Sequence, residues 1–197
     1  LIRPITLGNN AILTNTTNRF FVRQFGSNLD INMKNAGGNT LLLNFGAQNV
    51  LEVGKLVHIF VSWDTGNNKA QVYVDGVDKM FLPAAIVNEN IGYARPNWNV
   101  GSEVSAPVQI EGVLGQLWFS TEYVDPAVDI SKFFNNGPVD LGPNGESPTG
   151  TSPVIFLNNS LATWGTNLGS GGNFSAVGTP TDAGSLVLGP LNDLIII

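Results

Sequence analysis

Short stretches in which apolar and polar residues alternate recur along this chain, and they constrain its fold more than any other feature. Every second residue is apolar in 29–33 and 57–63, and the same spacing recurs in 71–75 and 116–120. Successive side chains of a β-strand point to opposite faces of a sheet, so a period of two predicts half-buried strands. Helical spacing is nearly absent.

Turn-forming residues separate these stretches. Residues 64–68 read DTGNN, a five-residue connection typical of a hairpin, and Asp75-Gly76 predicts a tight turn after the next strand. Further apolar runs that predict strands lie at 20–22, 41–45 and 154–157. Residues 125–134, with a proline near the start, predict one short helical turn. Many short strands at this spacing predict an all-β protein, an antiparallel β-sandwich or jelly roll.

We expect residues 1–197 to form a single domain. With 43% hydrophobic residues the chain can supply one large core, and no internal repeat is present. Residues 137–153 differ because prolines and glycines alternate there, which neither a helix nor a central strand tolerates. We expect this segment to be a surface loop or an extended crossover. Because the chain begins with leucine, we also expect it to be an excerpt or a processed product.

Charge is unusually scarce. Only 12% of the residues are charged, about half the usual share, so Asn, Thr, Ser and Gly must supply the polar surface. Such a surface fits either a neutral polar β protein or one covered by neighbours in an oligomer or particle. The net charge of −6 argues against a nucleic-acid partner. The absence of cysteine excludes disulfide frameworks and zinc fingers, and no apolar run is long enough to span a membrane.

Two adjacent segments carry a family resemblance. Residues 51–64 read LEVGKLVHIFVSWD and residues 69–76 read KAQVYVDG. Later, WNVG at 98–101 and GVLGQLWF at 112–119 match a strand before a variable loop and a late strand. Together these segments resemble the laminin-G-like, concanavalin A-like sandwich family, which implies an antiparallel jelly-roll β-sandwich. The sequence departs from the family pattern at Leu56, where an aromatic residue is common.

The C-terminal third carries a second resemblance. Residues 133–145 read FFNNGPVDLGPNG and residues 169–178 read GSGGNFSAVG. They are similar to a tail segment that accompanies this sandwich in structural proteins of tailed bacteriophages. The resemblance implies a virion protein that decorates the particle or contributes to the tail and host-contact apparatus, with other virion proteins as partners and a homo-oligomeric state.

Catalytic patterns are weak. Retaining glucanases of the same broad fold carry alternating carboxylates on one strand, and no such stretch is present, since Glu122 and Asp125 lie in a predicted loop. The single histidine, His58, lies within an apolar strand, where we expect a satisfied core or interface residue. No Gly-x-Ser-x-Gly motif accompanies it. We therefore predict that the chain is not an enzyme.

No cofactor is required by the sequence, although calcium is possible. Laminin-G-like domains often bind this ion through side-chain and backbone oxygens, and the resemblance implies Asp64, Asn67 and Asp75 as candidates by residue type. No dense acidic loop supports them. The glycine-rich stretch 169–172 lacks the Lys-Ser/Thr of a phosphate loop, and we expect it to be a flexible loop.

Loop aromatics with amide and charged neighbours are the usual means by which sandwiches bind carbohydrate. Tyr93, Arg95, Asn97 and Trp98 form the best candidate set for a host-surface glycan, and Trp164 is second. For each aromatic the alternative is a packing role.

Two functions therefore remain open, a virion structural protein and a glycan-binding module, while a hydrolase has little support. The first two are compatible, because a sandwich can be anchored by one edge and bind through loops at the other.

Overall fold

The computed structural model describes residues 1–15, 20–81, 86–95, 97–103, 109–182 and 195–196. It confirms an all-β architecture, because its strands pair antiparallel in several sheets. In the described part of the chain, none of the helices has the length and apolarity needed to cross a membrane.

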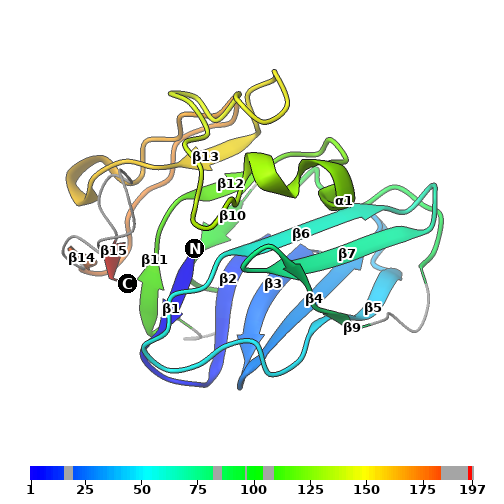
Figure 1. The fold of residues 1–197 in the computed structure, drawn as a ribbon, viewed down its shortest axis with the longest axis horizontal. Coiled ribbons are helices and arrows are strands. Elements are labelled where there is room, and N and C mark those ends of the chain that lie inside the picture. The colour runs from blue at the N-terminus through cyan, green and yellow to red at the C-terminus, as the bar shows by residue number, and fades with distance from the viewer. Residues whose placement is uncertain (16–19, 82–85, 96, 104–108, 183–194, 197) are drawn as a thin grey trace.

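A six-stranded sheet forms the back layer in Figure 1, in the order β10-β2-β3-β4-β5-β9. Its strands are β2 (Asn9–Asn15), β3 (Phe20–Phe25), β4 (Asn28–Lys34), β5 (Thr40–Ala47), β9 (Met80–Phe81) and β10 (Trp98–Val100). In β4 the buried residues are Leu29, Ile31 and Met33, so the predicted alternation is confirmed.

Strand β2 was not anticipated by the alternation. Its residues from Asn10 to Asn15 are all buried, because the strand lies between β10 and β3 and is covered on both faces. A strand buried on both faces loses the period of two. Its polar residues are hydrogen-bonded, as where Asn10 Nδ2 donates to Gln24 Oε1 at 3.0 Å.

A three-stranded sheet lies across the front of this layer (Figure 1). It consists of β6 (Ile59–Asp64), β7 (Lys69–Val74) and β8 (Val77–Asp78). The β6–β7 hairpin closes around the predicted turn, where Asp64 pairs with Lys69. Asp75 and Gly76 connect β7 to β8 with φ values of 50° and 75°, the left-handed backbone for which Asp-Gly turns are preferred.

The remaining strands form two small sheets. They are β12 (Leu117–Phe119) with β13 (Ile155–Leu157), and β1 (Ile2–Pro4) with β11 (Gly112–Leu114), β14 (Thr181–Asp182) and β15 (Ile195–Ile196). The family resemblance treats 112–119 as one strand, and this is wrong. The segment is divided between two sheets, because Gln116 takes a φ of 36° and interrupts the extended backbone.

Short helical turns follow β12 and β13. They are α1 (Pro126–Asp129), η2 (Ile130–Lys132) and η3 (Leu161–Thr163). The predicted turn is confirmed in α1 and η2: Pro126 begins the helix, and the carboxylate of Asp125 caps it by accepting a hydrogen bond from Ala127 N at 3.1 Å.

The main core fills the space between the back sheet and the front hairpin. Ile31 and Met33 of the back sheet belong to the same buried cluster as Val72 of β7. At one end of this core the ring of Phe20, which is 1% exposed, lies 5.6 Å from the ring of Trp63 and 5.4 Å from that of Phe119. Trp63 therefore packs on the core, as predicted.

A second buried cluster covers the other face of β6. Its members are Phe60, Val124, Phe133, Leu141 and Phe156. The opposite face of β6 presents Ile59, Val61 and Trp63 to the main core. Both faces of this strand are therefore packed, each against a different cluster.

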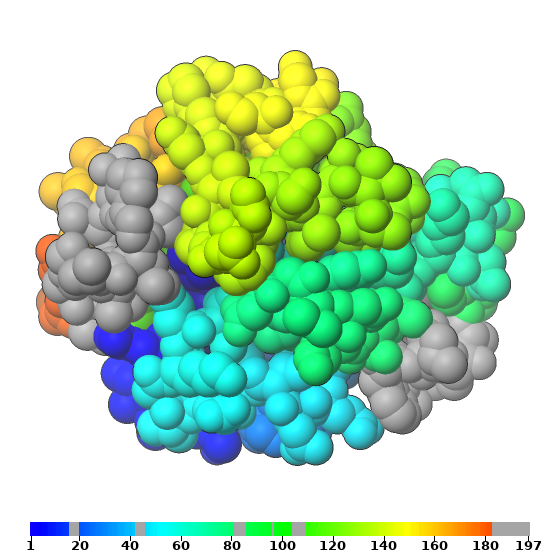
Figure 2. Space-filling view, viewed as in Figure 1, coloured from blue at the N-terminus to red at the C-terminus, as the bar shows by residue number. Residues whose placement is uncertain are grey.

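Residues 137–153 contain no helix or strand and run over the surface (Figure 2). The loop is nevertheless attached to the fold, because Leu141 is buried in the second cluster and Trp118 Nε1 donates to the carbonyl of Gly145 at 2.9 Å. Its backbone is an ordered surface loop, one of the two forms that its proline and glycine pattern predicts.

Candidate binding cleft

A cleft of about 790 Å³ opens beside β10, between that strand and the segment from 164 to 177. Four of the residues predicted to bind glycan line it, namely Tyr93, Asn97, Trp98 and Trp164. These residues come from segments about 70 positions apart, and the fold brings them to one concave surface.

The aromatic wall of the cleft is supported from behind. The ring of Trp98 lies 5.4 Å from that of Phe20 and 5.2 Å from that of Phe119. The ring of Tyr93 lies 5.9 Å from that of Phe119, and its hydroxyl accepts a hydrogen bond from Trp63 Nε1 at 2.7 Å. Burial raises the pKa of Tyr93 to about 12. Packing and cleft lining, which the sequence presents as alternatives, thus coexist in the same side chains.

The opposite wall is built from glycine-rich backbone. Phe174 N donates to the carbonyl of Gly165 at 2.8 Å, and a Cβ added at Gly165 would lie only 2.4 Å from the carbonyl oxygen of Phe174. Ser170 N and Gly171 N donate to the carbonyls that precede β13, at 2.8 and 2.9 Å. The stretch 169–172, expected to be a flexible loop, is therefore tied to its neighbours, and its glycines allow backbones to approach closely.

Asn167 organises this wall; it ends the second candidate stretch, 164–167, although its role in holding the wall was not predicted. Its side-chain oxygen accepts from Phe156 N at 2.8 Å and Gly169 N at 3.0 Å. Its amide nitrogen donates to the carbonyl of Val154 at 2.9 Å and to that of Gly172 at 3.3 Å. The sequence signal is limited to an asparagine before a glycine-rich stretch, which also fits an ordinary turn.

The electrostatic character of the cleft is neutral to weakly acidic. Glu103 lines it, together with the amide side chains of Asn97, Asn99, Gln109 and Asn173. Among the described residues that line the cleft there is no lysine or arginine. Aromatic faces and amides are suited to hydroxyl-rich, uncharged molecules.

Arg95, the remaining predicted glycan residue, does not line the cleft. Its guanidinium donates to the carbonyl of Ala36 at 2.8 Å and so ties the 93–95 loop to the turn after β4.

The three candidate calcium ligands are not brought together. Asp64 and Asn67 meet at the β6–β7 turn, where Asn67 Nδ2 donates to the carboxylate at 2.6 Å and lowers the pKa of Asp64. Asp75 follows the far end of β7 and accepts a hydrogen bond from His58 N at 2.8 Å. Strands of this length separate the two positions by roughly 17 Å, so the three residues do not share one site.

The residues considered for catalysis lie outside the cleft. Asp125 caps α1 and approaches Lys69 Nζ at 3.7 Å, and Glu122 lies exposed beside it. His58 is 8% exposed, stacks on Phe134 at 5.1 Å, and has a pKa lowered to about 3 by burial. It is a core residue as expected, but not a satisfied one, because its Nδ1 has no hydrogen-bond partner among the described residues.

Comparison with known proteins finds no family model, no curated protein and no solved structure that matches this chain.

Proposed function

We propose that this chain is a non-catalytic, glycan-binding β-sandwich of the concanavalin A-like jelly-roll type, carried on a bacteriophage virion. The jelly-roll assignment is supported by two antiparallel layers enclosing one core and by the tight turn at Asp75-Gly76. The binding assignment rests on one observation: Tyr93, Trp98 and Trp164 converge on a single cleft.

A neutral oligosaccharide is the ligand class that this cleft fits best. Apolar sugar faces pack against aromatic rings, while ring hydroxyls exchange hydrogen bonds with amides, which both donate and accept. An anionic glycan would meet Glu103 without a basic residue among the described lining to balance it. The net charge of −6 also repels an anionic glycan at long range.

Titration calorimetry against neutral and anionic oligosaccharides of matched length tests this proposal. We expect binding only to members of the neutral set, and an affinity about tenfold weaker for Trp164→Ala and Asn97→Ala, because each removes a contact worth about 1–2 kcal/mol. Tyr123→Ala is the matched control, since this half-buried tyrosine lies outside the cleft. Failure of the folded protein to bind any neutral glycan, or equal losses in the control, would contradict it.

Assembly into the particle is supported by a second surface. Four exposed apolar side chains lie close to one another in turns and at the end of β3. Two hydrogen bonds hold these segments together, because Gly26 N donates to Gly8 O at 2.9 Å and Gly54 N donates to Pro4 O at 2.8 Å. They are Ile5, Leu7, Phe25 and Val53, between 45% and 59% exposed. Exposed apolar groups gathered in this way are typical of interaction sites.

This apolar end lies away from the cleft. Along β2, Asn9 pairs with Phe25 at the apolar end and Asn15 pairs with Trp98 at the cleft, a separation of roughly 20 Å. The arrangement leaves the cleft open when the other end is covered by another copy or by another virion protein. The scarcity of charged residues is consistent with such a covered surface.

Sedimentation velocity and labelling of particles test the assembly proposal separately from glycan binding. We expect the wild-type chain to self-associate, Phe25→Asp to shift it toward monomer, and gold-labelled antibody to mark purified virions. A monomer at every concentration, together with unlabelled particles, would refute this part and leave the glycan proposal standing.

A further inference from the structure

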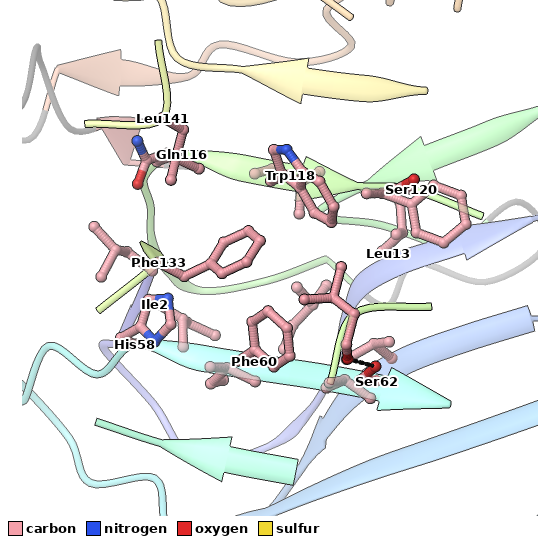
Figure 3. Close-up of a pocket in the computed structure, with 18 of the residues that line it drawn as sticks. Ile2, Leu13, His58, Phe60, Ser62, Gln116, Trp118, Ser120, Phe133 and Leu141 are labelled. Carbon is pink, nitrogen blue, oxygen red and sulfur yellow. Dashed lines mark hydrogen bonds between the residues drawn. The ribbon is translucent and has the colours of Figure 1, made fainter. Parts of the chain in front are cut away.

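A second hollow lies inside the molecule, between β6 and β12 (Figure 3). The two strands belong to different sheets, and their side chains line a cavity of about 150 Å³ that reaches the surface at Thr121 and Glu122. Buried apolar residues supply most of its wall, among them Ile2, Leu13, Phe60, Phe133 and Leu141. A cavity of this size with aliphatic and aromatic walls holds a molecule as large as benzene.

Two polar atoms in this wall have no hydrogen-bond partner within the described residues. They are His58 Nδ1 and Gln116 Nε2, each shielded from solvent. His58 as a whole is more than nine-tenths buried. Figure 3 shows Gln116 near Leu141 and His58 near Ile2, both on the side of the cavity away from Ser62. Ser62 differs from them because its hydroxyl is satisfied by the carbonyl of Val124 at 2.5 Å.

Unpaired buried polar atoms are rare in folded proteins, because each keeps the full cost of its lost hydration. Here the two atoms belong to the wall of one hollow, whose other polar groups include the satisfied hydroxyl of Ser62 and the Leu1 ammonium, which donates to the carbonyl of Gly115 at 3.0 Å. From this geometry we infer a second binding site, for a small uncharged molecule of the phenol class, with its ring among the apolar side chains and its hydroxyl toward His58 and Gln116.

A hydroxyl suits these partners better than any other single group. It donates and accepts at once, so it satisfies the imidazole nitrogen in either tautomer and also accepts from the amide of Gln116. A charged ligand would have to lose its hydration against apolar walls, which disfavours carboxylates and amines. The site is distinct from the cleft and does not depend on glycan binding.

Calorimetric titration of the folded protein with phenol and with toluene tests the inference. The two probes have nearly equal size, so their difference reports the hydroxyl. We expect both to bind and phenol to bind about tenfold more tightly, the effect of one further buried hydrogen bond. Quenching of tryptophan fluorescence should accompany binding, because Trp118 lines the cavity.

Two variants locate the hydroxyl. His58→Phe keeps a ring stacked on Phe134, and Gln116→Met keeps the side-chain length, so each should abolish the preference for phenol while toluene affinity persists. Thermal unfolding verifies that each variant is folded. If one variant does not fold, the other still tests the position of the hydroxyl. Failure of wild-type protein to bind phenol at millimolar concentration, or a phenol preference unchanged in the folded variants, would overturn the proposal and leave water as the occupant.

Discussion

The cleft and the smaller cavity meet at one strand, yet their polar groups are engaged in different ways. Phe119 of β12 lines both hollows. On the cleft side amides and half-buried aromatics face solvent, and their hydrogen-bonding groups are largely engaged with the protein. On the cavity side the walls are apolar, and two polar atoms are unpaired. The comparison shows how one short strand separates a surface suited to sugars from a space suited to a small ring.

Trp63→Ala should have the largest effect and should damage both hollows. The indole packs against Phe20 and Phe119, lines the cavity, and donates to Tyr93 behind the cleft. Its removal should cost about 3–5 kcal/mol of unfolding free energy, through lost packing and a new void. Urea denaturation measures this loss. An unchanged midpoint would show that Trp63 does not support the core.

Acid should destabilise the cavity side through His58. The folded protein holds this imidazole neutral, with a pKa of about 3 against 6.5 for an unperturbed histidine. The unfolded chain therefore binds a proton that the folded chain refuses, so this contribution is complete above pH 6.5 and is lost as the pH falls toward 3. Between pH 7 and pH 4 the loss amounts to roughly 3 kcal/mol.

The comparison of wild type with His58→Phe isolates this contribution, because the carboxylates titrate in both proteins. Between pH 7 and pH 4 the denaturation midpoint of wild type should fall further than that of the variant, because only wild type carries the His58 contribution. Parallel pH profiles would show that His58 is accessible to protons in the fold.

Asn167→Ala should have the smallest of these effects on stability and should act on the cleft alone. Removing its amide leaves the buried N–H of Phe156 without its acceptor, which costs about 1–3 kcal/mol. The wall from 167 to 174 should then lose its position, and glycan affinity should fall while the phenol preference is retained. Asn159→Ala, which removes hydrogen bonds from an asparagine outside both hollows, is the matched control.

Strands in which apolar and polar residues alternate could be predicted from the sequence, whereas β2, which lacks this alternation, could not. Leu29, Ile31 and Met33 of β4 follow the expected alternation, and the turns at 64–68 and Asp75-Gly76 close as their residues predict. Strand β2 was not predicted because asparagines flank its short apolar run and its burial is continuous, so no alternation marks it. The break at Gln116 divides 112–119 into β11 and β12, which join different sheets. This division depends on tertiary packing and not on the local sequence.

The candidate cleft was partly predictable for a related reason. Tyr93, Trp98 and Trp164 stand out as aromatics in loop sequences, and their residue types were sufficient to single them out. Proximity in sequence was a poor guide to proximity in space. Arg95 lies between two cleft residues but points elsewhere, and Asp75 resembles Asp64 in type but follows the opposite end of a hairpin. The cavity left no trace in the sequence, because its walls come from segments that each resemble ordinary core.

The packing of both faces of β6 has a consequence for how the molecule opens. One face belongs to the cluster around Phe20 and the other to the cluster around Phe133, so neither cluster can melt without exposing this strand. Local fluctuations of one region would have to break contacts of the other, which joins the two into one cooperative unit. Amide hydrogens of β6 should therefore exchange with solvent deuterium only when the whole sandwich unfolds.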